Sequence, residues 1–100
     1  MKEMFVQPEE VIFDEDAQDD FSLYFIVYGK VQIEYKVKKV RVIEKGACFG
    51  EIGFFSGMPR TARAKSLFFT NLYKLDRDFT MEQLKSIPSD FVRIGLNFQY

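Results

Sequence analysis

Hydrophobic and polar residues alternate along much of this chain, which is the pattern expected of β-strands with one buried face. Turn residues separate the alternating stretches: Tyr28-Gly29-Lys30 marks one turn and Lys38-Lys39 forms a compact polar tip. Short strands are therefore predicted at Val11–Phe13, Leu23–Val27, Val31–Val37, Val40–Ile43, Ala62–Phe69 and Asn71–Leu75. Several short antiparallel strands at this spacing favour a two-sheet roll, a mainly β fold.

Helical patterns are expected at the two ends of the chain. Lys2 to Val6 is interpreted as the end of a helix, and Asp78 is expected to cap a helix over Phe79 to Lys85. Pro88 lies near the start of a further predicted helix. That last helix contains the apolar residues Phe91, Ile94, Leu96 and Phe98.

Composition indicates one small domain with a single core. The chain has 100 residues, 47% of them hydrophobic, and its net charge of -1 comes from 14 basic and 15 acidic residues. We expect the core to draw on the 12 phenylalanines and 5 tyrosines. The balanced charge offers no footprint for nucleic acid, so no nucleic-acid partner is expected.

The sequence also restricts location and metal chemistry. No apolar run approaches the roughly 20 residues that span a bilayer, so we expect no direct membrane insertion by this chain, and no signal-peptide pattern is present. Cys48 is the one cysteine and there is no histidine, so no intrachain disulfide and no metal site are expected. A reducing, cytoplasmic location is the corresponding expectation.

The segment from Cys48 to Ala64 is the candidate site. Gly50 and Gly53 allow the backbone to turn tightly and bring N–H groups close to an anion. Glu51 would repel that anion, so it is expected to accept hydrogen bonds from ligand hydroxyls such as those of a ribose. Arg60 provides the opposite charge and can hold two phosphate oxygens at once.

These residues resemble the phosphate-binding cassette of cyclic nucleotide-binding domains, found in regulatory kinases, ion channels and bacterial catabolite activators. Phe49-Gly50-Glu51-Ile52 and Arg60-Thr61-Ala62 match both conserved parts of that cassette with suitable spacing. The likeness extends to Val11-Ile12-Phe13, to Leu23 through Val31, and to Leu72 through Asp78. It therefore covers nearly all of the chain.

The resemblance implies a single domain over residues 1–100: an antiparallel β-roll, or jelly roll, of about eight strands with short flanking helices. The roll is expected over about 1–77 with the cassette at 49–62, and the C-terminal helices over 78–100, with the lid helix cut short at Tyr100. Phosphate and ribose ligands are then expected to contact Phe49, Gly50, Glu51, Ile52, Arg60, Thr61 and Ala62. Val40 and Val42 are the expected contacts of the base.

By the same resemblance, the function is that of an allosteric sensor for cAMP or cGMP, not an enzyme, with no cofactor beyond the nucleotide. The segments Arg60-Thr61-Ala62 and Asn71 to Asp78 resemble the channel members most, which indicates the cytoplasmic gating domain of a cation or potassium channel. The partner is then an effector module of the parent chain, a channel pore or a kinase. Alternatives are a regulatory domain of a cyclic nucleotide-dependent kinase and a non-binding homologue that acts as an assembly scaffold.

Several residues also have plainer interpretations. As an alternative to ligand binding, Glu51 and Arg60 could form a structural ion pair with each other. Thr61 could equally be a residue that favours a β-strand and has no contact with a ligand. Arg63 either reaches the pocket or pairs with an acidic neighbour. We expect Cys48 to be a small buried hydrophobe, and the acidic stretch 14–20 to be a solvated loop that lacks the ligand order of a calcium site.

Overall fold

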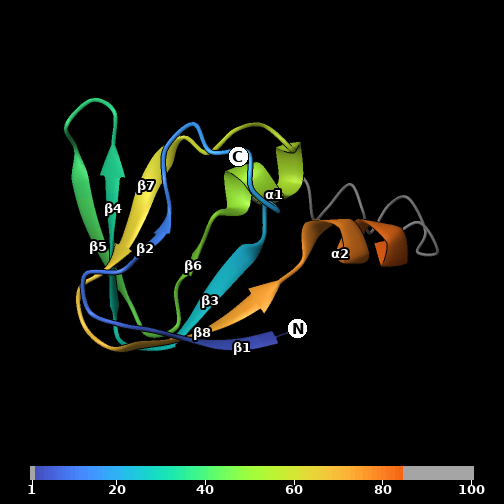
Figure 1. Ribbon diagram of the computed structural model, residues 1–100. Coiled ribbons are helices and arrows are strands. Elements are labelled where there is room, and N and C mark those ends of the chain that lie inside the picture. The colour runs from blue at the N-terminus through green and yellow to red at the C-terminus, as the bar shows by residue number, and fades with distance from the viewer. Residues whose placement is uncertain (1, 85–100) are drawn as a thin grey trace.

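The computed structural model describes residues 2–84, which form a β-roll with two short helices (Figure 1). Its elements are β1 (Lys2–Val6), β2 (Val11–Phe13), β3 (Leu23–Tyr28), β4 (Lys30–Tyr35), β5 (Val40–Glu44), β6 (Cys48–Phe49), α1 (Glu51–Ser56), β7 (Ala62–Ser66), β8 (Thr70–Leu75) and α2 (Arg77–Leu84). The strands make two four-stranded sheets, in the orders β1-β8-β3-β6 and β2-β7-β4-β5. The paired strands are antiparallel, so the predicted mainly β roll is confirmed.

The hydrophobic core lies between the inner faces of the two sheets. It is formed by alternate residues of the strands, namely Val6, Phe13, Tyr24, Ile26, Val31, Ile33, Ile43, Phe49, Ala62, Ala64 and Leu72. Three of its rings form one cluster: the centroid of Phe49 lies 5.1 Å from that of Tyr24 and 5.9 Å from that of Phe13. This cluster lies directly beneath the cassette and connects the core to the site.

The N-terminal segment corrects one prediction. Lys2–Val6 is not the end of a helix but the edge strand β1, paired with β8 so that Met4 faces Leu72 across the ladder. The intrinsic propensities of these five residues do not distinguish a helix from a strand. Their structure is decided by pairing with β8, which is distant in sequence. Val6 is fully buried, so burial against the sheet favours the strand.

The cap of α2 also differs from expectation. The helix begins at Arg77, and the side chain of Asp76 accepts a hydrogen bond from the backbone N–H of Phe79 at 2.8 Å. Asp76 is therefore the N-cap, while Asp78 lies in the first turn, where its charge favours the helix dipole. The second predicted C-terminal helix, with Pro88 and Phe91, falls outside the described residues.

The tight connection between β3 and β4 carries the chain from one sheet to the other at Gly29. This glycine has a φ of 109°, and a Cβ atom placed on it would lie 2.5 Å from Oγ1 of Thr70. Only glycine fits this crossing without displacing β8. Neither α1 nor α2, the helices of residues 2–84, is long and apolar enough to cross a bilayer.

Candidate ligand-binding site

The cassette begins where β6 ends. Gly50 takes a left-handed conformation, with φ 84° and ψ 11°, and turns the chain from β6 into α1. The first hydrogen bond of that helix runs from the N–H of Phe54 to the carbonyl of Gly50 at 3.1 Å. The amides of Glu51, Ile52 and Gly53 precede this bond, so they have no acceptor within the helix and are available to an anion.

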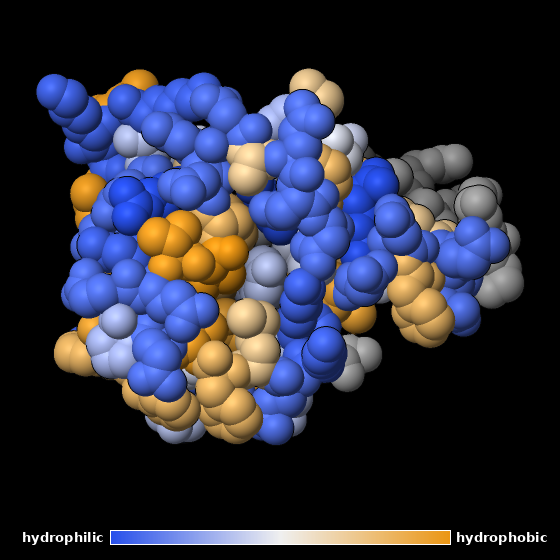
Figure 2. All heavy atoms as spheres, in the orientation of Figure 1, coloured by the Kyte–Doolittle hydropathy of each residue, from blue (hydrophilic) through white to orange (hydrophobic). Residues whose placement is uncertain are grey.

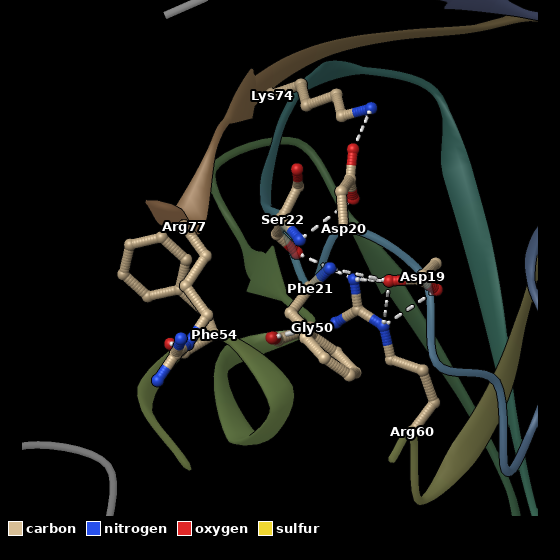
Figure 3. Close-up of polar contacts among 9 residues, drawn as sticks. All are labelled: Asp19, Asp20, Phe21, Ser22, Gly50, Phe54, Arg60, Lys74 and Arg77. Atoms are coloured by element: carbon tan, nitrogen blue, oxygen red, sulfur yellow. Dashed lines mark hydrogen bonds and ion pairs between the residues drawn. The ribbon is translucent and has the colours of Figure 1, made fainter. Parts of the chain in front are cut away.

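Arg60 reaches back from the loop after α1 and is buried beneath the cassette, with a side chain only 1% exposed (Figure 3). Its Nη1 donates to the carbonyl of Gly50 and its Nη2 to the carbonyl of Ser22, each at 3.0 Å. The guanidinium also lies over the ring of Phe13, 4.1 Å from the centroid. A buried cation needs such partners, because desolvation otherwise costs several kcal/mol.

The charge of Arg60 is balanced by Asp19. Nε of Arg60 lies 3.2 and 3.1 Å from the two carboxylate oxygens, and Nη2 lies 2.9 Å from Oδ1. The ion pair suggested between Arg60 and Glu51 is therefore replaced by one with Asp19. From the sequence, Asp19 was expected to lie in a solvated loop, and its separation of 41 residues from Arg60 gave no local signal of this pair.

These contacts use most of the hydrogen-bonding capacity of Arg60. A guanidinium has five N–H donors. Asp19 accepts from the Nε donor and from one Nη2 donor, Ser22 accepts from the second Nη2 donor, and Gly50 accepts from one Nη1 donor. One Nη1 donor is left. Arg60 thus fixes the cassette and keeps one Nη1 donor without a partner among residues 2–84.

Both cassette glycines lie in close contact with the Arg60 side chain. A Cβ atom at Gly50 would lie 2.9 Å from Nη1 of Arg60, and one at Gly53 would lie 3.0 Å from the same atom. At Gly50 the φ of 84° also disfavours any residue with a Cβ, whereas at Gly53 the guanidinium would have to move by a few tenths of an ångström.

A cavity opens beside the cassette, between the two sheets. Its lining includes all seven residues predicted to hold phosphate and ribose: Phe49, Gly50, Glu51, Ile52, Arg60, Thr61 and Ala62. The remaining lining residues are Phe13, Ile33, Tyr35, Arg41, Ile43, Cys48 and Gly53. Figure 2 shows apolar atoms exposed in the middle of this face, with hydrophilic residues around them.

Val40 and Val42, the predicted base contacts, do not line the cavity. They are 56% and 48% exposed and lie opposite Glu34 and Gln32 on the outer face of the sheet. Side chains alternate between faces along a strand, so β5 presents Arg41 and Ile43 to the cavity instead. The register follows from Ile43, which is buried and shares its face with Arg41.

Arg63 also lies outside the cavity lining. Its guanidinium is 3.7 Å from Asp14 and 3.9 Å from Glu34. Of the two roles considered for Arg63, pairing with acidic neighbours is the one that the structure supports.

Two charged side chains at the cavity have no hydrogen bond or ion pair to any residue in the described range 2–84: Glu51 and Arg41. Cys48, predicted to be buried, is exposed at the edge of the cavity. Partial burial, with a smaller contribution from the charge of Glu51, raises the pKa of the Cys48 thiol. Among the described residues, the cavity therefore has one unpaired carboxylate and one unpaired guanidinium.

The loop that carries Asp19 is held by its neighbour. Oδ2 of Asp20 lies 2.6 Å from Nζ of Lys74 on β8, and its Oδ1 accepts from the N–H of Ser22 at 3.2 Å (Figure 3). Burial raises the pKa of Asp20, but the hydrogen bonds from Lys74 and Ser22 outweigh it, so the pKa is lowered. The hydrogen bond to Asp20 in turn raises the pKa of Lys74.

The cassette is also joined to the C-terminal helix. Arg77, the first residue of α2, donates from Nε to the carbonyl of Phe54 in α1 at 2.7 Å. A shift of α1 therefore changes a contact of α2 directly.

Three of the solved structures with a similar fold each have a TM-score of 0.74 or above. The first is the Thermus thermophilus catabolite activator protein. That protein has 21% identity and a TM-score of 0.78, with 98% of this chain and 47% of that chain covered. PKAR CBD2 bound to Sp-2Cl-cAMPS has 25% identity and a TM-score of 0.74, with coverage of 98% and 66%. An EAL enzyme in its cAMP-bound form has 21% identity and a TM-score of 0.74, with coverage of 98% and 28%.

The chain thus spans between 28% and 66% of the length of these three. The likenesses at 21% identity concern the fold alone. A family model, described as the cyclic nucleotide-binding domain, matches residues 3–86. The chain therefore belongs to the cyclic nucleotide-binding domain family.

Proposed function

We propose that the cavity binds a purine 3',5'-cyclic nucleotide, cAMP or cGMP, through the cassette. The observation that carries the proposal is the meeting, in one cavity, of the free amides before Phe54, the unpaired carboxylate of Glu51 and the remaining Nη1 donor of Arg60. The amides and Arg60 suit the phosphate, and Glu51 suits the ribose hydroxyl.

In this pose the base extends towards β4 and β5. Ile33 and Ile43 supply apolar surface there, and Tyr35 and Arg41 add polar groups that could reach a base edge. This proposal replaces Val40 and Val42 by the residues of the opposite strand face. Phe49 and Ala62 support the cassette from below, while Thr61 lies exposed at the cavity rim.

We further propose that the domain is a sensor without turnover, and that its parent is a cation or potassium channel gated from the cytoplasm. The resemblance of Arg60-Thr61-Ala62 and Asn71 to Asp78 to channel members supports this parent. A regulatory domain of a kinase is the second candidate, since PKAR CBD2 is among the similar structures. Reading the full gene separates them: transmembrane helices before this domain would support the channel, and a kinase-inhibiting or dimerisation segment would contradict it.

The binding proposal is tested by calorimetric titration of the chain with cAMP and cGMP, using Glu51→Gln as the diagnostic variant. Glu51 has no partner in the described structure, so its substitution should leave folding intact, whereas Arg60→Ala would also remove buried contacts. A hydrogen bond to a charged group contributes about 1.5–3 kcal/mol, so Glu51→Gln should raise the Kd roughly 10- to 100-fold.

Glu15→Gln is the matched control, because Glu15 is exposed in the acidic loop away from the cavity. Its Kd should equal that of the parent protein. Unchanged affinity in Glu51→Gln would refute the ribose role, and absence of any binding would favour the assembly scaffold. Release of nucleoside monophosphate from either nucleotide would contradict the sensor without turnover.

A further inference from the structure

Of the charged residues that line the cavity within residues 2–84, Arg41 alone lies outside the cassette, which carries the other two, Glu51 and Arg60. Arg41 belongs to β5, at the edge of the sheet β2-β7-β4-β5 (Figure 1), and its register partner on β4 is Ile33. Its positive charge therefore lies at the end of the cavity towards which the base is proposed to extend.

The sheet places Arg41 at a suitable separation from the cassette. The cassette ends at Ala62 on β7, and β4 lies between β7 and β5. Neighbouring strands are about 4.8 Å apart, so β5 lies about 10 Å from β7. A purine nucleotide held by its phosphate and ribose extends over a comparable length, so the far edge of its base reaches β5.

The guanidinium of Arg41 is not used by the fold. It has no hydrogen bond or ion pair in the part of the chain that the structure describes, whereas Arg60, Arg63 and Arg77 each have a protein acceptor. Its neighbours in the cavity, Ile33 and Ile43, are apolar and offer no acceptor from their side chains. The donors of Arg41 are therefore available to a ligand.

We propose that Arg41 recognises the base edge and that the cavity consequently prefers cGMP to cAMP. Guanine presents two acceptors side by side, O6 and N7, and a guanidinium donates to both at once. Adenine presents N7 beside the N6 amino group, which is a donor. Because a guanidinium has donors only, it keeps one hydrogen bond to adenine, and its second N–H faces another donor.

The other polar side chain at this end of the cavity does not discriminate between the purines. Tyr35 lines the cavity from β4, and its hydroxyl both donates and accepts, so it suits guanine and adenine alike. The choice of base therefore depends on Arg41.

This inference rests on the proposed function, because it concerns the base of the nucleotide that the cassette holds. The test is calorimetric titration of the whole chain with cGMP, cAMP and inosine 3',5'-cyclic monophosphate. The inosine base keeps O6 and N7 of guanine but lacks the 2-amino group, so it isolates the two acceptors assigned to Arg41.

A bidentate contact discriminates between bases by about 5- to 150-fold. Because Arg41 is exposed, we expect the lower part of this range, with cGMP bound about 10-fold more tightly than cAMP. The inosine nucleotide should bind like cGMP.

Arg41→Gln is the diagnostic variant, because a glutamine amide offers a donor and an acceptor and pairs with N6 and N7 of adenine. Arg41 has no partner to lose among residues 2–84, so this variant should fold like the parent protein, and its preference for cGMP should disappear or reverse. Lys45→Gln is the matched control. It removes the same charge from an exposed side chain just after β5 that does not line the cavity, and it should keep the parent's ratio of the two Kd values.

The outcomes separate this inference from the proposed function. A parent protein that binds both nucleotides equally, or cAMP more tightly, would overturn the inference and leave the proposed function in place. An unchanged Kd ratio in Arg41→Gln would also overturn it, since a lost charge alone weakens both nucleotides equally. An inosine nucleotide that binds like cAMP would assign the preference to the 2-amino group instead of Arg41. Failure of all three nucleotides to bind would refute the proposed function, and the inference with it.

Discussion

Removing the carboxylate of Asp19 tests the most specific electrostatic feature of the site. Asp19→Ala leaves the buried guanidinium of Arg60 without its counter-ion, and it also removes the acceptor for the N–H of Phe21, 2.7 Å from Oδ1. The fold is expected to become less stable, because a buried charge that loses its partner retains its desolvation cost.

The magnitude follows from what remains around Arg60. Losing one partner of a buried pair costs about 3–5 kcal/mol in general. Here Asp19 is itself 31% exposed, and the carbonyls of Gly50 and Ser22 and the ring of Phe13 stay in place. We therefore expect about 2–3 kcal/mol for Asp19→Ala, which lowers the melting temperature of a domain of this size by roughly 10–20 °C.

Urea denaturation followed by tyrosine fluorescence or circular dichroism gives the free energy of unfolding. The matched pair is Asp19→Asn and Asp16→Asn, which make the same chemical change in the same loop. Asp16 pairs with Lys36 at an exposed site, and asparagine tolerates the positive φ of 62° at this position. Asp16→Asn should thus leave the denaturation midpoint nearly unchanged, while Asp19→Asn lowers it clearly; equal effects of the two would refute the buried-pair reasoning.

Three other predictions follow from the same contacts. Gly50→Ala should destabilise the fold by about 2 kcal/mol and weaken nucleotide binding, since its Cβ would lie 2.9 Å from Nη1 of Arg60. Gly46 is the control, because it also has a positive φ, of 89°, but a Cβ there would meet no atom within 4 Å. Gly46→Ala should therefore introduce backbone strain alone and leave nucleotide binding unchanged. The pKa of Asp20 is lowered by its hydrogen bonds from Lys74 and Ser22, so the pair with Lys74 stabilises the protein above the ordinary pKa of 3.8 and loses its contribution as the pH falls through the lower folded pKa. The difference in unfolding free energy between the parent protein and Lys74→Met should therefore shrink as the pH falls below about 4. A constant difference would be evidence against this reasoning. Arg77→Ala removes the contact with Phe54 and should reduce the change that nucleotide causes in hydrogen exchange of α2, whereas an unaltered change would show that α1 and α2 communicate elsewhere.

Local patterns predicted much of the fold. Alternation identified β3, β4 and β7, because every second residue of these strands is buried in the core. The strand β1 was missed because its structure depends on pairing with β8 at the far end of the described chain. Its residues have no local signal that distinguishes an edge strand from a helix end.

The site shows the same division. The cassette residues were predicted together because glycine turns, an acidic residue and an arginine form a recognisable local motif. The partner of Arg60 was not predicted, because Asp19 is 41 residues away and its role arises only when the sheets pack. The register of β5 was misjudged because Val40 and Val42 were chosen for apolar character, while the inward face is defined by the buried Ile43.

The pairing of β1 with β8 also has a consequence for synthesis in the cell. Lys2 pairs with Lys74 and Val6 with Thr70, so β1 leaves the ribosome well before its partner β8, which is the last strand among the described residues. At about 5–20 residues per second, the delay is roughly 4–14 seconds, during which Val6 and the inner face of β3 lack their partner. Long-range pairings of this kind fold slowly, so a nascent chain stalled before β8 should be the form of this domain most prone to chaperone binding and aggregation.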